Sequence, residues 1–378
     1  MEAKQRMFFE FLKFCIGKSK DIPKSLKDAD WAEMYDFANK QALTGVLFHG
    51  IRQLPKELAP SGNLLMQWVG MAQRIRQENV RLFLDSAKVY QKFRQAGFCT
   101  CILKGQGNAL LYPDPYMRIP GDIDIYIKGG RKQIMEYVDG VSPHQVMRYH
   151  HVDFPVMKTP VEVHFMPSYM FCPWYNHRMQ KWFCKVMGAQ CLNVVVLPDG
   201  YGEITVPTDS FNIVFILSHL YRHLFTEGIG LRQFLDYYYV VNKWYSTHVG
   251  SVVLNRKAKQ TNLHLEELQR DLKWLGLWKF AGAVMFVLHK AFGLTVDRMI
   301  VPMDEAEGQF LLDEIMQGGN FGLYDDRLGD KTGEGKVHRY FRMSLRNIRF
   351  VKHYPSEALC EPLFRTYFWA WKKMHRRN

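Results

Sequence analysis

The chain has 378 residues, 47% of them hydrophobic, which is enough to bury a large core in two or three packed domains. Lysine and arginine total 50 against 37 acidic residues, and the net charge of +13 favours anionic partners such as nucleotides, nucleic acid or a membrane surface, although it also serves solubility. The seven cysteines form no Cys-x-x-Cys motif, which argues against a disulfide framework or a zinc ribbon and favours a reducing compartment. No apolar run reaches the roughly 18 to 20 residues of a membrane span, so we expect no transmembrane segment. Lys13 interrupts the short N-terminal apolar segment, so we expect no signal peptide. Both observations favour a cytoplasmic protein.

Residues 1–97 have helical periodicity. Phe8, Phe11 and Ile16 fall on one apolar face, Asp30 is placed to cap a second helix, and Gly97 to end the last one. We interpret this region as a helical scaffold that covers one side of a sheet.

Residues 98–103 predict a buried strand, which Lys104-Gly-Gln-Gly107 interrupts just before a short helical stretch at 108–112. Glycine lets backbone N–H groups approach an anion, a helix start adds partial positive charge, and a lysine adds a full one. We therefore predict that Lys104, Gly105 and Gly107 contribute to a phosphate-binding turn.

Over residues 121–127, three isoleucines alternate with Asp122, Asp124 and Tyr126, so a strand here has a core face and an acidic face. Carboxylates two residues apart on a strand, about 6.6 Å between Cα atoms, can converge on one divalent cation or bridge two. Without a cation they repel each other. A pair of aspartates at this spacing more often lies on an ordinary solvated strand edge than in a metal site. The neighbouring motifs decide between these two interpretations.

Downstream, residues 149–156 and 161–165 predict a hairpin turned at 158–160. In its second strand, Glu162 and His164 share one face. This adds a third carboxylate on a strand able to neighbour the first two.

These motifs resemble the uncharacterised nucleotidyltransferase family of the DNA polymerase β-like superfamily. The likeness rests on Lys104-Gly105, Arg118, Asp122-Ile-Asp124 and Glu162-Val-His164. Segments 31–50, 219–236 and 354–357 are similar to the helical parts of that family. The broader superfamily usually has Gly-Ser or Gly-Gly where Lys104-Gly105 stands here, and a shorter run to the aspartates.

The resemblance implies that Asp122 and Asp124 hold two Mg²⁺ or Mn²⁺ ions, one of them shared with Glu162. The shared ion would activate an acceptor hydroxyl, and the other would neutralise the triphosphate as pyrophosphate leaves. His164 is expected to orient Glu162 or to act as an acceptor-side base.

The same resemblance assigns phosphate positioning to Lys104 and to the backbone at Gly105 and Gly107. Arg118 would be a further clamp, since its planar guanidinium suits phosphate oxygens.

A Pro/Gly loop at 198–208 marks the start of a second helical region. There His219 and His223 share a helix face, for which we favour packing or nucleotide contact over metal, because no third ligand is evident. Arg232 and Asp236, four residues apart, predict a structural ion pair.

Three further features lie in the C-terminal part of the chain. The glycine-laden stretch 318–336 is expected to be a mobile surface loop, and the arginines at 339, 342, 346 and 349 to form a solvated face rather than a nucleic-acid or triphosphate contact. The aromatic and basic segment 369–377 resembles an interfacial membrane anchor, but we favour packing followed by a charged tail.

Together these features predict an α+β protein with a small mixed-sheet nucleotidyltransferase core at 98–200, a helical N-terminal region at 1–97 and a helical C-terminal region at 201–378. The predicted reaction moves a nucleoside monophosphate from an NTP, for example ATP, to a hydroxyl of an acceptor that is a small molecule, a protein or an RNA.

Two alternatives stay open. One is a homologue that binds nucleotide or RNA without turnover. The other is an Asp-x-Asp glycosyltransferase, which the helical region ahead of the motif disfavours, because such enzymes place the motif after alternating strands and helices.

Overall fold

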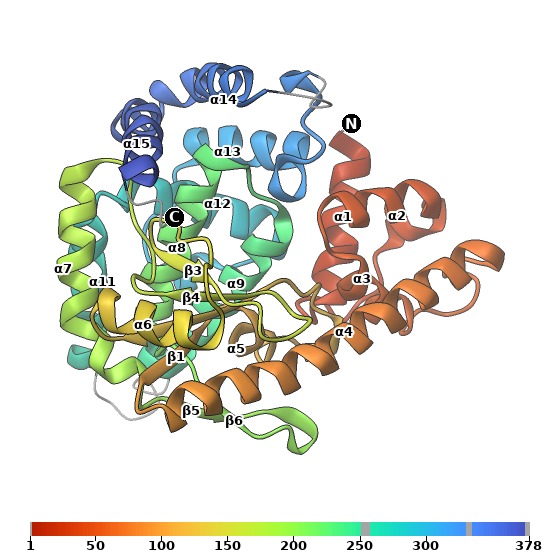
Figure 1. Cartoon of the computed structure of the whole chain (residues 1–378). Coiled ribbons are helices and arrows are strands. Elements are labelled where there is room, and N and C mark those ends of the chain that lie inside the picture. Colours follow the sequence, from red (N-terminus) through yellow and green to blue (C-terminus); the bar gives the residue numbers. More distant parts are fainter. Residues whose placement is uncertain (1, 251–257, 330–334, 375–378) are drawn as a thin grey trace.

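The computed structural model describes residues 2–250, 258–329 and 335–374, and its architecture is α+β (Figure 1). The helices are α1 (Glu2–Cys15), α2 (Trp31–Lys40), α3 (Thr44–Ile51), α4 (Gly62–Gln95), α5 (Gly105–Ala109), α6 (Arg131–Val141), α7 (Pro173–Gln190), α8 (Asp209–Thr226), α9 (Leu231–Tyr245), α11 (Ala258–Trp274), α12 (Trp278–Phe292), α13 (Glu305–Gly318), α14 (Lys336–Val351) and α15 (Pro355–Met374). The strands are β1 (Cys99–Leu103), β2 (Ile123–Lys128), β3 (His151–Asp153), β4 (Val161–His164), β5 (Val194–Val196) and β6 (Glu203–Thr205). The predicted fold class is confirmed.

The central sheet has the strand order β1-β2-β4-β3, in which β2 and β4 are parallel and the other pairs are antiparallel. Strands β1, β3 and β4 lie within the segments predicted as strands, and β2 overlaps its predicted segment but ends one residue later, at Lys128. In the parallel pair Asp124 lies opposite Glu162, and in the antiparallel pair His151 lies opposite His164. This register gathers polar side chains from three strands on one face.

Helices α4 and α6 cover the other face. The isoleucines of β2 are buried in a cluster with Phe83, Val89 and Phe93 of α4 and Val138 of α6. The period-2 pattern thus separates a core face from an acidic face, as predicted. Gly97, with φ +82°, follows the end of α4 and turns the chain into β1.

The segment predicted as a plain Pro/Gly loop includes part of a small hairpin, and that prediction is corrected. Strands β5 and β6 pair antiparallel across Pro198–Gly200, and the hydroxyl of Thr205 donates to the carbonyl of Thr100 on β1. The apolar residues of β5 and β6 were a strand signal on either side of a turn signal.

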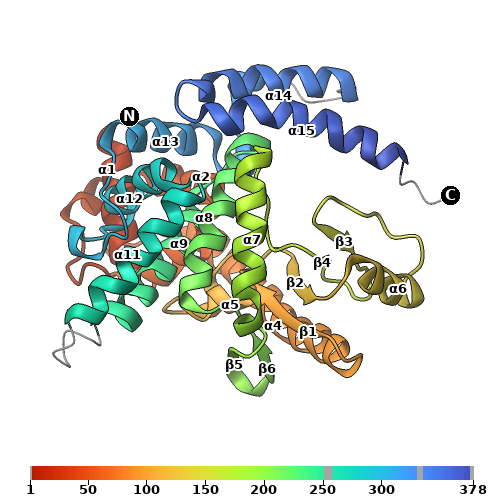
Figure 2. The same ribbon diagram turned by 90° about the vertical axis from the view of Figure 1, so that its left-hand side faces the viewer.

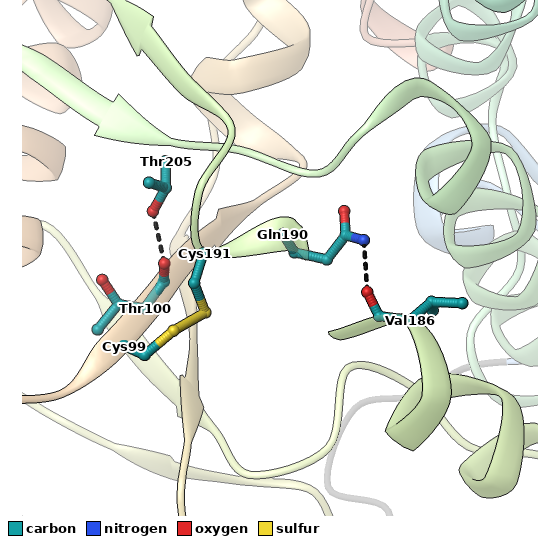
Figure 3. Close-up of a disulfide and its surroundings, with 6 residues drawn as sticks. All are labelled: Cys99, Thr100, Val186, Gln190, Cys191 and Thr205. Atoms are coloured by element: carbon teal, nitrogen blue, oxygen red, sulfur yellow. Dashed lines mark hydrogen bonds between the residues drawn. A yellow bond between two sulfur atoms is a disulfide. The ribbon is translucent and has the colours of Figure 1, made fainter. Parts of the chain in front are cut away.

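A disulfide joins Cys99, at the start of β1, to Cys191, just after α7 (Figure 3). Their Cα atoms are 5.7 Å apart and the bond closes a sequence separation of 92 residues. The sequence suggested no disulfide framework, and it did not predict this single bond. The motif argument failed because it weighed local spacing, whereas this contact depends on the tertiary fold.

The helical regions share one large core. A single buried cluster runs from Phe8 of α1 through Phe215 of α8 and Met285 of α12 to Phe350 of α14. Figures 1 and 2 show α1–α3 on one side of α12 and the α14–α15 hairpin along an outer edge of the molecule. Asp30 caps α2 as predicted, since its carboxylate accepts from the N–H groups of Ala32 and Glu33.

Two of the four arginines expected to be solvated are instead tied to the body of the protein. Arg346 is buried and donates to the carbonyl of Leu224 at 2.8 Å, and Arg349 lies 2.6 Å from a carboxylate oxygen of Glu314. The expectation fails for them because that side of α14 packs on α8 and α13.

The glycine-laden stretch 318–336 is only partly described, because residues 330–334 lie outside the described residues. Within the described part, Asn320–Gly322 and Asp326–Leu328 form single 3₁₀ turns, and buried Asp325 lies 2.8 Å from Arg327.

No single helix among the described residues has the length and apolar character needed to cross a bilayer. The segments Leu263–Trp274 and Trp278–Phe292 reach that threshold only when taken together, and they are bent by 119° relative to each other.

Candidate active site

Three carboxylates lie at the N-terminal ends of the two central strands of the sheet. Asp124 and Glu162 are direct neighbours on the parallel strands β2 and β4, and Asp122 immediately precedes β2. Oxygen atoms of Asp124 and Glu162 and a ring nitrogen of His164 all lie within 4.8 Å of one another. The three predicted metal-binding carboxylates therefore line the same cavity.

Lys104 neutralises part of this charge. Its Nζ lies 2.9 Å from Oδ2 of Asp124, a contact that arises because Leu103 pairs with Asp124 in the β1–β2 ladder and Lys104 follows directly. The backbone of Lys104 has φ +44°, a conformation that residues with a side chain rarely adopt and that is enriched at functional sites. Burial opposes its charge, but Asp124, Asp122 and Glu162 raise the pKa of Lys104.

His164 links two of the carboxylates. Its Nε2 is 2.8 Å from Oδ1 of Asp124 and 3.4 Å from Oε2 of Glu162. Burial disfavours the charged ring, but these two partners raise the pKa of His164 above its ordinary value. The predicted role of His164 as an orienting residue is consistent with these contacts and stays a prediction.

His151 of β3 was missed by sequence reasoning. Its Nδ1 lies 3.3 Å from Oε2 of Glu162, and burial together with the nearby His164 lowers the pKa of His151 to about 3. The ring is therefore neutral at physiological pH. The signal for it was the predicted hairpin, since antiparallel pairing sets His151 opposite His164.

Asp124 and Asp122 differ in how readily their carboxyl groups ionise. Burial opposes ionisation of Asp124, but Lys104 and His164 lower the pKa of Asp124, while the charge of Asp124 together with burial raises the pKa of Asp122. Clustered carboxylate oxygens are a donor set that suits Mg²⁺ and Mn²⁺, and the adjacent imidazole nitrogens can hold those carboxylates in place. The residues present thus fit a divalent metal centre.

Arg118 lies in the cavity wall and forms a buried bidentate pair with Asp236 of α9, with two N–O distances of 2.8 Å. Tyr112 also donates to Asp236, at 2.7 Å. The pair leaves Nη1 of Arg118 buried, with no partner among the described residues. Because guanidinium N–H groups bind phosphate oxygens well, this unpaired nitrogen is consistent with the predicted clamp.

Arg232 extends the same positive wall. Its Nη1 is 3.6 Å from Asp236, so the predicted ion pair forms, although Arg118 makes the closer contact. Its buried Nε likewise has no partner in the described structure.

Helix α8 supplies the wall opposite the sheet. His219 Nε2 lies 3.4 Å from Lys104 Nζ, and Arg222 Nη1 lies 2.7 Å from Nε2 of His150. Burial, followed by the nearby cations, lowers the pKa of both His150 and His219, so these rings are neutral and the positive charge belongs to Lys104 and Arg222. Nothing in the sequence pattern distinguished Arg222 from other basic residues on helices.

The cavity between these walls has a volume of about 720 Å³, which is large enough for a nucleotide. Gly105, with φ +48°, lines it. Gly107 does not line the cavity: a Cβ there would lie only 2.8 Å from Cγ1 of Val206, so a close approach of α5 to the segment after β6 requires this glycine.

Aromatic side chains close one end of the cavity. Tyr149, which precedes β3, contacts Phe364 and Phe368 of α15 at ring-centre distances of 4.9 and 6.0 Å. Tyr149, Tyr169 and Phe368 all line the cavity, so the C-terminal helix contributes to its wall.

Comparison with known proteins identifies a family for this chain. A family model described as uncharacterised nucleotidyltransferase matches residues 27–269, more than half of the chain and all of the residues that form the acidic cluster. No curated protein and no solved structure gave a significant match. The chain belongs to this uncharacterised nucleotidyltransferase family.

Proposed function

We propose that the protein is a metal-dependent enzyme that transfers a nucleoside monophosphate from an NTP to an acceptor hydroxyl. The hydroxyl oxygen loses its proton to water and forms a bond to the α-phosphorus, the bond from that phosphorus to the bridging oxygen breaks, and pyrophosphate leaves. The observation that carries the proposal is the register of β2 and β4, which pairs Asp124 with Glu162 beside Lys104 and His164.

In this proposal Asp122, Asp124 and Glu162 hold Mg²⁺ or Mn²⁺, and His164 orients Asp124 and Glu162 through its short contacts to both. When bound, a divalent cation at such a centre neutralises phosphate charge and lowers the pKa of a coordinated hydroxyl.

Phosphate binding is assigned to the positive wall of the cavity. Arg118 and Arg232 each have a buried N–H group that bonds to nothing in the described part of the chain, and Asp236 holds both guanidinium groups in place. Lys104 lines the same cavity and would contribute a further positive charge toward the phosphates.

The test is transfer of label from each of the four α-³²P-labelled NTPs, with Mg²⁺ or Mn²⁺, to fractionated RNA, protein and small molecules. The wild type should label one fraction and release pyrophosphate, which identifies the acceptor class. Asp124→Asn and Glu162→Gln should each lower transfer by about a hundredfold or more, because they remove preorganised charge from the transition state.

Glu136→Gln serves as the matched control, since this carboxylate is exposed on α6 and outside the cavity. Its transfer rate should equal that of the wild type. Unchanged transfer in both Asp124→Asn and Glu162→Gln would reject the site.

One observation favours a second candidate, a nucleotide-binding protein without turnover. The ammonium group of Lys104 already compensates Asp124 at 2.9 Å. Calorimetric binding of Mg²⁺-NTP by the wild type with no pyrophosphate release against any acceptor fraction would support this candidate instead.

An Asp-x-Asp glycosyltransferase receives no such support. Four helices precede β1, and the sheet is small and mixed, unlike the parallel α/β unit that such enzymes use.

A further inference from the structure

Helices α14 and α15 carry an apolar surface that nothing in the described structure covers. Eight large apolar side chains on the two helices are between 53% and 73% exposed: Val337, Phe341, Leu345, Ile348, Leu359, Leu363, Tyr367 and Met374. At 100° per residue, each set of four falls within about 80° of its helix. Each helix is therefore amphipathic with its apolar row facing outward, the reverse of what packing in a core would produce.

The two rows face the same side. The helices form an antiparallel hairpin in which Tyr340 Oη contacts the carbonyl of Pro362 and Oγ1 of Thr366, at 3.3 and 3.1 Å (Figure 2). Around the axis of α14, Tyr340 lies about 100° from Phe341. Around the axis of α15, Pro362 and Thr366 lie about 100° and 60° from Leu363. The contact residues are therefore on the flank of each helix that faces the other helix. Phe350 and Ala358 are buried beneath the hairpin. The rows thus form one surface, which we call the outer hairpin surface.

The segment that forms this surface is strongly basic in sequence. Residues 336–378 contain eleven lysines and arginines against two glutamates, and so contribute +9 of the net charge of +13. Of the described cations, Arg346 is buried and Arg349 and Arg365 pair with carboxylates, whereas Arg339, Lys352 and Lys373 are exposed. Both glutamates are buried, Glu357 against the backbone of Phe171 and Glu361 against Arg365. Among the described residues of the hairpin, no carboxylate side chain is exposed.

Cations and an indole ring lie beside the apolar rows. Lys352 is exposed next to the end of the α14 row, and Lys373 is exposed near the end of α15 with its Nζ 4.0 Å from the centre of the Trp369 ring. Trp369 itself is largely exposed. Lysine stems can lie along an apolar layer while their ammonium groups reach a charged one, and tryptophan prefers such an interface.

We propose that the outer hairpin surface binds the surface of a bilayer that contains anionic lipids. The apolar rows enter the boundary between head groups and acyl chains, to a depth of about 5–10 Å, while the surrounding cations contact lipid phosphates. A second copy of the chain is a poor occupant, because it would bring two strongly positive surfaces together. Nucleic acid would use the cations but leave the apolar rows exposed to water.

The surface lies on the opposite side of α15 from the cavity. Phe368 lines the cavity, whereas Leu363 and Tyr367 belong to the outward row, so one helix separates the two. Docking as proposed would hold the cavity close to the bilayer, within reach of acceptors at its surface. The docking itself does not depend on nucleotidyl transfer.

The test is co-sedimentation of the full chain with phosphatidylcholine vesicles that either contain or lack phosphatidylglycerol. We expect binding to the anionic vesicles, little binding to the neutral ones, and weakening as salt is raised. The variant Phe341→Gln with Leu363→Gln should bind more weakly by on the order of tenfold or more, since it removes two apolar groups that enter the bilayer.

Two further variants separate the electrostatic contribution to vesicle binding from the apolar one. Lys352→Gln with Lys373→Gln should lose part of the preference for anionic vesicles and keep the apolar contribution. Met66→Gln with Leu192→Gln, which changes two equally exposed apolar residues on α4 and beyond α7, should bind like the wild type. Circular dichroism and thermal unfolding establish that every variant is folded, as expected for exposed positions.

Three results would overturn the proposal. These are no binding to anionic vesicles, equal binding by the wild type and Phe341→Gln with Leu363→Gln, and a dimer in light scattering that this variant loses while vesicle binding stays unchanged.

Discussion

Lys104 competes for the place that a metal ion would need, because its ammonium group and a divalent cation would neutralise the same carboxylates. We therefore expect Lys104→Gln to destabilise the metal-free protein, since Asp122, Asp124 and Glu162 would repel one another with less compensation. Mg²⁺ or Mn²⁺ should then raise the thermal unfolding temperature of Lys104→Gln more than that of the wild type. Differential scanning calorimetry with and without EDTA measures both effects.

Lys88→Gln provides the control, because this lysine is exposed and its Nζ lies 4.0 Å from Oδ1 of Asp85, too far for a strong ion pair. It should leave the response to metal unchanged. An equal or smaller metal response in Lys104→Gln than in the wild type would contradict the placement of the cation at these carboxylates.

Arg118 and Asp236 form a buried pair whose loss should be costly. Arg118→Met leaves the carboxylate of Asp236 buried without its bidentate partner, and we expect the free energy of unfolding to fall by about 3–5 kcal/mol. Replacing both residues, by Arg118→Met with Asp236→Leu, should recover part of that loss. Urea denaturation of the wild type, both single variants and the double variant measures the coupling.

The exposed pair of Arg94 and Glu203 is the matched control, with an N–O distance of 3.2 Å and about half of each side chain in solvent. Arg94→Met should cost only about 0–1 kcal/mol. An equally mild effect of Arg118→Met would contradict the expectation that this buried pair stabilises the fold more than the exposed pair does.

The residues of the site were predictable to different extents for a physical reason. Alternation along β2 and β4 places Asp122, Asp124 and Glu162 on definite faces, because the side-chain period of a strand is fixed at two residues. His151 and Arg222 depend on strand register and on where α8 packs, which are settled by long-range contacts. Gly107 was predicted for the turn, but its neighbour Val206 lies nearly a hundred residues away in sequence.

At the scale of elements, α15 is anchored by a buried acid. Glu357 accepts hydrogen bonds from the N–H groups of Phe171 and Cys172, at 2.6 and 3.1 Å, and burial nevertheless raises the pKa of Glu357 to about 7. The folded protein thus holds this proton more tightly than the unfolded chain does, for which the ordinary value of 4.5 applies. The stabilisation is present below that value and is lost as pH rises through about 7.

We expect the free energy of unfolding of the wild type to fall by roughly 3 kcal/mol over this pH range relative to Glu357→Gln, which cannot titrate. Urea denaturation at several pH values between 4.5 and 8 measures the difference. Glu136→Gln, exposed on α6, should parallel the wild type. Parallel curves for Glu357→Gln and the wild type would show that Glu357 does not titrate in this range.

Elements with strong periodicity were predicted well, and elements that depend on partners were not. Strand β4 (Val161–His164) lies in the segment predicted at 161–165, since Val161 and Val163 alternate with Glu162 and His164. The arginines of α14 look alike in sequence, yet Arg346 is buried and Arg339 is exposed. What a charged helix face contacts follows from the surrounding fold rather than from its own pattern.

At the scale of the whole molecule, the three predicted regions are linked by a common core. Phe11 of α1, Phe215 of α8 and Phe280 of α12 belong to one buried cluster, although predicted boundaries at 97 and 200 separate the first from the other two. The disulfide between Cys99 and Cys191 closes the central region, and the hydroxyl of Thr205, from the next region, bonds back to β1. The cytoplasmic location stays a prediction, and the redox state of this cysteine pair in cells bears on it.

We therefore predict that fragments 1–200 and 201–378 do not fold separately. Each fragment would expose many large apolar side chains, and leaving one Phe, Leu or Ile in water costs roughly 1.5–3 kcal/mol. With several such residues exposed, the deficit exceeds the roughly 5–15 kcal/mol that stabilises a typical domain. The intact chain should unfold in one transition, with the same urea midpoint by tryptophan fluorescence and by far-ultraviolet circular dichroism. Separate midpoints, or a dispersed NMR spectrum from either fragment alone, would instead establish the boundary at residue 200 as a true domain limit.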